Sequence, residues 1–347
     1  MRIYAAYDDG LRIVDPATGA VETRLSGQRV DCLSVADPGD GAAGAGTRGP
    51  RVLAGTFDAG LFRSVDGGER FAGAAASTLG PEGSGPDAVT AVATSPHDPS
   101  VVWIGTEPSR AYRSVDGGET AALVGGLTDL PSASEWSFPP RPDTHHVRWI
   151  EPDPADPALL HVAVEAGALL RARVDADGSV DWTDRVPSAR QDVHTIATHP
   201  ELPDNAWVAA GDGYAETTDA GESWQHPQTG LDHTYCWSVA VGRPAESTPQ
   251  VLLSAATSAR EAHRTGESYL YRREGGAWER LDDHGIPTGE GVYRAVLASG
   301  TEESTFWAAN NHGLYHTTDG GDTWAEIDVA WPERVREQTC RGLTIVD

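Results

Sequence analysis

Charged, polar and aromatic residues recur at one position of a segment that the chain repeats seven times. Aligning the first strand-like run of each repeat gives seven equivalent residues: Asp31, Thr90, Arg148, His194, Trp237, Arg294 and Arg341. If the seven repeats are arranged around one axis, three guanidinium groups, an imidazole and an indole meet near it. Removing them from water together is costly without a compensating partner. A carboxylate or phosphate would compensate them through bidentate hydrogen bonds, so the pattern predicts an anion site. The alternative is a water-filled channel whose arginines pair with acidic side chains such as Asp31, Glu135, Glu290 or Glu337.

One long connection adds a candidate to this site. Residues 132–146 are too many for a simple link between repeats. Long structureless segments in compact domains are usually lids or binding loops. We expect Trp136 in this segment to offer a stacking surface, together with Trp237 and Tyr235.

A second insertion, Ser258–Glu267, adds Arg260, His263 and Arg264. Asn310 and His312 follow the second strand of the last repeat and complete the expected ligand-binding residues. Half of the histidines are expected near the same site: His145, His146, His194, His233, His263 and His312.

Those histidines raise the question of a metal. Two or three of them with a carboxylate would suit zinc or a similar ion. No closely spaced motif such as HExxH accompanies them, and the chain has no lysine for a P-loop or a Schiff base. We therefore expect neither a bound metal nor a cofactor.

A repeated turn must position these residues. The sequence SVDGGERF at 64–71 returns as SVDGGETA at 114–121, TTDAGESW at 217–224 and TTDGGDTW at 317–324. The aspartates are 50, 103 and 100 residues apart, which is one period followed by two doubled periods. A period of about 50 residues indicates a solenoid, propeller or array. Short oxygen side chains followed by glycine are typical of a turn that bonds its own backbone.

This turn resembles the Asp-box, or BNR repeat, Ser/Thr-x-Asp-x-Gly-x-x-Trp/Phe. Three copies match fully, and the second has Ala121 in place of the aromatic residue. The resemblance implies a β-propeller in which the box joins the third and fourth strands of a blade. It also implies that the box aspartates are structural rather than catalytic. Such repeats occur in sialidases, xyloglucanases, sortilin-type receptors and a photosystem II assembly factor, so they indicate fold more than function.

The strand-like runs predict an all-β, seven-bladed β-propeller of four antiparallel strands per blade, forming a single domain over residues 1–347. The first blade has only three runs. The last run, 340–347, reads as an innermost strand, so we expect it to complete the first blade and remove the exposed sheet edges. The Gly/Ala-rich stretch at 38–50 is expected to be mobile.

The composition of the chain limits the kinds of partner that are expected. All 26 basic residues are arginine, and 52 acidic residues give a net charge of -26, a balance we associate with salt-loving organisms. Such a charge repels nucleic acids and anionic membranes, so neither is expected as a partner. The start has no basic-then-apolar leader, and no apolar run is long enough for a membrane helix, which predicts a cytoplasmic protein. The three cysteines have no close pairing that would indicate a disulfide framework.

Three functional classes remain open. The first is a propeller that binds an anionic small molecule, acidic glycan or peptide without turnover. The second, implied by the resemblance to sialidases, is a glycosidase or lyase, with Arg148, Arg294 and Arg341 holding a sugar carboxylate. By that resemblance a glycosidase would use Tyr235 or Tyr293 as nucleophile with Glu290 near it, whereas a lyase would use His194 or Tyr235 as base. The third is a scaffold for a protein partner, similar to the photosystem II assembly factor.

Overall fold

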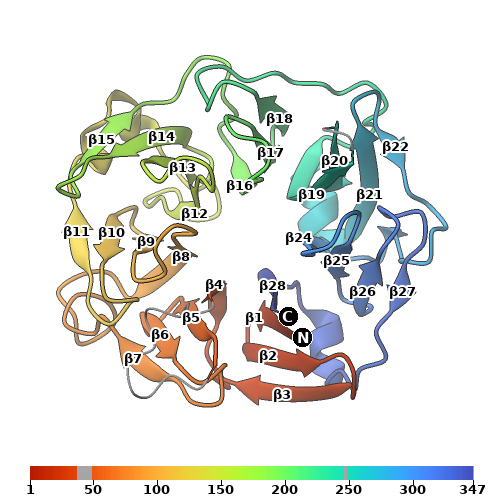
Figure 1. Ribbon diagram of the computed structural model, residues 1–347, viewed down its shortest axis with the longest axis horizontal. Helices are drawn as coiled ribbons and strands as arrows, with labels where there is room; N and C mark the ends of the chain where they lie inside the picture. Colours follow the sequence, from red (N-terminus) through yellow and green to blue (C-terminus); the bar gives the residue numbers. More distant parts are fainter. Residues whose placement is uncertain (37–48, 246–247, 347) are drawn as a thin grey trace. The chain divides into compact units, whose positions relative to one another are not determined.

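The computed structural model describes residues 1–36, 49–245 and 248–346, so most of the Gly/Ala-rich stretch lies outside the described residues. The fold is the predicted seven-bladed β-propeller, built from antiparallel sheets with four strands in most blades (Figure 1). The first sheet has the order β28-β1-β2-β3. Its strands are β1 (Arg2–Tyr7), β2 (Gly10–Asp15), β3 (Ala20–Arg24) and β28 (Gly342–Val346).

The other sheets follow in chain order, each beginning with its first strand. The second sheet contains β4 (Val30–Ala36), β5 (Arg51–Thr56), β6 (Leu61–Ser64) and β7 (Ala72–Ala74). The third contains β8 (Ala88–Thr94), β9 (Val102–Glu107), β10 (Ala111–Ser114) and β11 (Ala122–Val124). The fourth contains β12 (Val147–Pro152), β13 (Leu159–Val164), β14 (Ala168–Val174) and β15 (Val180–Thr183).

The fifth sheet has three strands, β16 (Val193–Thr198), β17 (Ala206–Ala210) and β18 (Gly213–Thr217). Where its fourth run was predicted, a single bridge joins Glu216 to Gln225. The sixth contains β19 (Tyr235–Ala245), β20 (Thr248–Ala256), β21 (Glu267–Glu274) and β22 (Glu279–Arg280), with β23 (Gly289–Glu290) paired to β21. The seventh contains β24 (Val296–Ser299), β25 (Phe306–Ala309), β26 (Leu314–Thr317) and β27 (Ala325–Glu326).

Helical structure in the described residues is limited to short pieces. They are the 3-10 helices η1 (Leu127–Asp129), η2 (Pro131–Glu135) and η4 (Glu333–Glu337), and the π-helix η3 (Glu261–Thr265). Within the described ranges, none of these helices has the length and apolar character needed to cross a bilayer.

The last strand completes the first sheet, as predicted. β28 pairs with β1, which places the two ends of the described chain in one sheet (Figure 1). The sheet reaches four strands only with this pairing. The order also gives β1 a hydrogen-bonding neighbour on each side, so β1 is not an exposed edge.

Internal contacts divide the chain into two compact units. Unit 1 comprises Met1–Ala5, Val14–Glu22 and Pro187–Asp347, and unit 2 comprises Ala6–Ile13 and Thr23–Val186.

The second strand of each sheet forms the core. All residues of β5, β9 and β13 are buried, whereas the outermost strands β7 and β11 are largely exposed. Small residues let neighbouring sheets approach closely. At Gly105 in β9, a Cβ atom would lie 2.5 Å from Cγ1 of Val147, so a larger residue would clash with β12.

The repeated turn is held by its own hydrogen bonds. In the last copy, the Thr317 hydroxyl donates to Oδ1 of Asp319 (2.7 Å) and accepts from the backbone N–H of Gly321 (3.0 Å). Asp319 also accepts from the backbone N–H of Thr323 (2.9 Å) and from its hydroxyl (2.6 Å), and Trp324 is 6 % exposed. The same pattern of bonds recurs around three other aspartates: Asp66, Asp116 and Asp219.

These bonds also determine the acidity of the aspartates. Partial burial alone would raise the pKa of Asp319, but the hydrogen bonds from Thr323 and Thr317 outweigh it and lower the pKa to about 2. The pKa values of Asp66 and Asp219 are likewise lowered to about 2. The carboxylates are therefore charged acceptors that fix the turn, which gives them a structural role.

Replacing Asp319 with alanine should destabilise the protein. Asp319→Ala leaves three donors from Thr317 and Thr323 without their acceptor, which should cost about 1–3 kcal/mol in the free energy of unfolding. Chemical denaturation followed by circular dichroism measures the loss. Asp58→Ala, at an exposed aspartate outside the repeated turn, is the control and should change little. Equal losses in the two variants would contradict the structural role of Asp319.

The pH dependence of this difference gives a second readout. Because the folded-state pKa of Asp319 is lowered, its stabilisation is complete above the ordinary aspartate value of 3.8 and is lost as pH falls toward about 2. The stability difference between the wild-type protein and Asp319→Ala should therefore shrink only over that acidic range.

Candidate functional site

The structure places five of the seven aligned residues at one backbone feature. The pairing of β4 with β5 passes from Val30 directly to Cys32, which leaves Asp31 as an extra residue in a β-bulge. Bulges interrupt four other first strands in the same way, at Thr90, Arg148, His194 and Trp237. A bulge re-aims a side chain and is frequent beside active sites. The aligned residues therefore occupy equivalent, specially oriented positions in five blades.

The remaining two aligned residues lie just before a first strand. Arg294 precedes β24 by two residues, and Arg341 immediately precedes β28. Both belong to unit 1, whereas Arg148 belongs to unit 2. The joint clamp of Arg148, Arg294 and Arg341 stays a prediction.

A connected cluster in unit 1 brings together several predicted residues. We call it the His–Tyr–Arg cluster: His194, Tyr235, Trp237, His263 and Arg294. Two of its residues sit at the bulges of β16 and β19, Tyr235 begins β19, and His263 comes from η3 in the second insertion.

Hydrogen bonds connect this cluster from its buried end to its exposed end. Nδ1 of His194, a fully buried side chain, lies 2.7 Å from the carbonyl oxygen of Cys236. The hydroxyl of Tyr235 lies 3.5 Å from Nε2 of His194 and 2.7 Å from Nε2 of His263. Arg294 then donates from its Nη1 to Nδ1 of His263, which is exposed.

The two ends of this chain indicate where its protons lie. A carbonyl only accepts, so Nδ1 of His194 carries a proton, and a guanidinium only donates, so Nδ1 of His263 carries none. His263 is therefore neutral and donates from Nε2 to the oxygen of Tyr235. The Tyr235 hydroxyl is left to donate to Nε2 of His194. All bonds run in one direction, from Arg294 inward to Cys236.

Arg294 is held against an aromatic face. Its guanidinium carbon lies 4.6 Å from the centre of the Trp237 ring, and its Nη2 donates to the hydroxyl of Thr339 (2.7 Å). The Trp237 ring centre is 4.6 Å from that of His194 and 5.5 Å from that of His263. A half-buried indole beside a cation gives the cluster both an apolar face and a positive charge.

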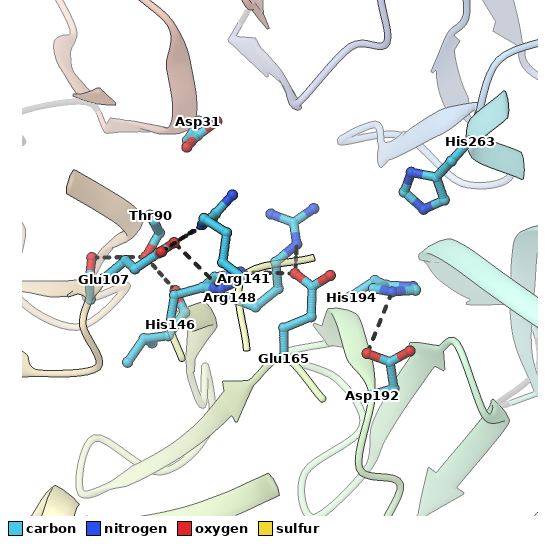
Figure 2. Close-up of polar contacts among 12 residues, drawn as sticks. Asp31, Thr90, Glu107, Arg141, His146, Arg148, Glu165, Asp192, His194 and His263 are labelled. Atoms are coloured by element: carbon cyan, nitrogen blue, oxygen red, sulfur yellow. Dashed lines mark hydrogen bonds and ion pairs between the residues drawn. The ribbon is translucent and has the colours of Figure 1, made fainter. Parts of the chain in front are cut away.

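An acid lies close to the buried end of the cluster. Oδ1 of Asp192 is 4.0 Å from Nε2 of His194, and its side chain is one-third exposed (Figure 2).

A cluster in unit 2 contains Arg148, and its arginines are paired with acids (Figure 2). Arg141 forms a two-pronged pair with Glu107, with Nε 2.8 Å from Oε1. Nε2 of His146 lies 2.9 Å from Oε2 of Glu165, and Nε of Arg148 lies 3.4 Å from the same oxygen. Both arginines of this cluster thus face a carboxylate of the chain, which an incoming anion would have to displace.

The sequence reasoning missed both acids of this unit 2 cluster. Glu107 ends β9 and Glu165 follows β13 directly, each at the end of a buried second strand. Asn310 follows β25 in the same way and was singled out from the sequence. Selecting the residue that directly follows the second strand in every repeat would also have selected Glu165.

Two other predicted residues are buried and bonded locally. Trp136 is 5 % exposed, packs in the core of unit 2, and donates from Nε1 to the hydroxyl of Ser132 (3.1 Å). Asn310 is 2 % exposed, and its side-chain oxygen accepts from the backbone N–H of His312 (2.8 Å). These bonds shape the loops that contain them.

Asp31, Glu290 and His312 are the remaining predicted residues. Asp31 is buried and accepts from Nε of Arg29 (2.8 Å). Glu290 is exposed in β23, and the exposed ring of His312 has its Nε2 3.3 Å from the carbonyl oxygen of Gly291. Roles for Asp31, Glu290 and His312 in a ligand site stay predictions.

Comparisons with known proteins support the fold. No family model matches the chain, and no curated protein sequence matches it. Among solved structures it is similar to an ancestral GH74 enzyme, with a TM-score of 0.60 and 15 % identity over 86 % of this chain and 38 % of that one. The chain thus spans well under half the length of that enzyme.

Two other solved structures cover the chain nearly end to end. YCF48 from Cyanidioschyzon merolae has a TM-score of 0.54 and 15 % identity over 90 % of this chain and 94 % of that one. The Cps50 (Swd1) β-propeller domain of Myceliophteria thermophila has a TM-score of 0.54 and 14 % identity over 88 % and 92 %. At these identities the likeness shows a shared β-propeller fold and nothing about activity.

The proton positions in the His–Tyr–Arg cluster are open to direct measurement. Nitrogen-15 NMR of the histidine rings should show a proton on Nδ1 of His194, and on Nε2 but not Nδ1 of His263. Tyr235→Phe removes the hydroxyl that joins the two rings and should shift both sets of signals. The exposed ring of His226, which lies outside the cluster, is the internal control. Protonation of His263 at Nδ1 would contradict the one-directional chain.

Proposed function

We propose that this protein is a binding β-propeller that takes a small anionic molecule or an acidic glycan at the His–Tyr–Arg cluster. The observation that carries the proposal is the position of Arg294, held against the Trp237 ring and bonded to His263 and Thr339. Charge-assisted bonds to a carboxylate or phosphate are about twice as strong as bonds to neutral acceptors. An anion would therefore compete well with a histidine nitrogen and a threonine hydroxyl for Arg294.

The exposure of the cluster supports the same role. His194 and Tyr235 are buried, with 0 % and 8 % of their surface exposed. His263 is exposed, and Trp237 and Arg294 are half-buried. A ligand would thus meet the arginine, the indole and the outer histidine. The buried pair would keep His263 in its orientation, which is the support that a preorganised site needs.

The net charge of -26 bears on ligand selection. An acidic surface repels anions at long range, so a positive group that binds one must act at contact distance. Arg294 with its flat aromatic neighbour provides such a short-range site. A planar guanidinium suits a carboxylate better than lysine would, because its N–H groups match the two oxygens.

Replacing Arg294 tests the proposal. Arg294→Gln removes the charge and should weaken binding of D-glucuronate by about 10- to 100-fold, the range expected for hydrogen bonds to a charged group. Isothermal titration calorimetry measures the dissociation constants. Arg173→Gln, at an exposed arginine of unit 2 that pairs with Asp156, is the control and should bind like the wild-type protein.

Two results would contradict binding of an anion at this cluster. One is equal affinity of the wild-type protein for D-glucuronate and for methyl β-D-glucoside, which has no carboxylate. The other is undiminished affinity of Arg294→Gln.

The hydrogen-bond chain itself favours a second candidate, an enzyme that moves a proton on a carboxylated sugar. Tyr235 donates its hydroxyl proton to Nε2 of His194, so a proton taken up at its oxygen can be matched by passing the hydroxyl proton to that imidazole. If this is the function, the wild-type protein should release unsaturated uronate or reducing sugar from an acidic polysaccharide. Tyr235→Phe should then lower the rate by 100-fold or more while leaving affinity within a few-fold. A wild-type protein that binds such a polysaccharide and leaves it intact would exclude the enzyme.

A further inference from the structure

Arg294 and His263 form a donor–acceptor pair at the exposed end of the His–Tyr–Arg cluster. The guanidinium donates, and Nδ1 of His263 accepts. The direction is imposed from inside the protein, because Nε2 of His263 uses its proton on the oxygen of Tyr235, 2.7 Å away. Neutral His263 therefore presents an acceptor, and not a donor, toward Arg294.

A ligand that draws Arg294 away from His263 changes what the histidine needs. A carboxylate is itself only an acceptor, so it satisfies the arginine but cannot replace the bond that Arg294 donates to Nδ1 of His263. Losing that bond costs more once a ligand covers the nitrogen. A ligand that brings a hydrogen-bond donor close to its anionic group restores the bond and so fits both residues.

The aromatic neighbour restricts the ligand further. The Trp237 ring lies beside both residues, with its centre 4.6 Å from the guanidinium carbon of Arg294 and 5.5 Å from the centre of the His263 ring. Such an indole face suits the C–H face of a saturated ring. Carboxylate, neighbouring hydroxyl and saturated ring are the features of a sugar acid.

We infer that the ligand of this site is a hydroxy acid on a sugar ring, with its carboxylate on Arg294, a nearby hydroxyl donating to Nδ1 of His263, and its ring against Trp237. The inference rests on the proposed function, because it requires that an anion binds at Arg294. It goes beyond that function because His263 recognises the hydroxyl by accepting its hydrogen bond. His263 would thus make the site bind sugar acids more tightly than carboxylic acids without hydroxyls.

Proton uptake is the competing way to satisfy His263. Once the charge of Arg294 is neutralised by an anion, Nδ1 could take a proton from solvent instead of a bond from a hydroxyl. The charged and titratable groups around this ring include Arg294, Tyr235 and, beyond Tyr235, His194 with Asp192. Glu261 and Arg264 lie on η3 with His263. A site that works in this way would bind hydroxylated and plain acids equally and would consume a proton on binding.

Calorimetry with two matched acids decides between these possibilities. D-Glucuronate and cyclohexanecarboxylate both carry one carboxylate on a six-membered saturated ring, and only the first has hydroxyls. The wild-type protein should bind D-glucuronate about fivefold more tightly, the contribution of one neutral hydrogen bond. His263→Phe keeps an aromatic ring without the acceptor and should remove this preference. His226→Phe, at an exposed histidine outside the cluster, should retain it.

Each contrary result has a distinct meaning. Equal binding of the two acids by the wild-type protein overturns the inference and leaves anion binding at Arg294 intact. A preference that survives in His263→Phe also overturns it, because the hydroxyl would then be read elsewhere. Binding enthalpies that vary with the ionisation enthalpy of the buffer, without a preference for D-glucuronate, show proton uptake and overturn it as well. Failure of both acids to bind refutes the proposed function itself.

Discussion

The backbone pairing of the first strands is the constraint on which the candidate site depends. Each first strand must satisfy its amides against the second strand, because a buried unpaired amide is costly. In five blades the ladder is interrupted by one extra residue, and each time that residue is polar or aromatic. The interruption gives the side chain an orientation that a regular strand would not allow. Regular pairing on either side of the bulge then keeps that orientation rigid.

Much of the fold could be predicted because the repeat is periodic. The spacing of the turn motif shows the period of the repeat. That period predicts the strands, the equivalence of the blades, and the strand missing from the first blade, which β28 supplies. The same equivalence identified Asp31, Thr90, Arg148 and His194 as one structural position before their bulges were known. A repeated local pattern can be read from sequence because each copy obeys the same short-range rules.

The contacts of the site were less predictable, because they depend on segments that break the period. His263 comes from a π-helical insertion, and nothing in the repeat fixes its distance from Tyr235 or Arg294. Glu107 and Glu165 follow the period, but their pairing with Arg141 and His146 depends on the path of residues 132–146. Long-range side-chain pairs of this kind arise from loop geometry, which composition and spacing do not encode.

The pairing of β28 with β1 has a consequence for the order in which the chain folds. β1 pairs with β2 soon after both are made, but its other neighbour, β28, follows only after more than 300 further residues have been added. At translation rates of roughly 5–20 residues per second, β1 therefore waits for tens of seconds with one edge uncovered. Until β28 is made, this open edge can pair with a wrong strand. A chaperone that shields it would therefore act on β1 before β28 emerges.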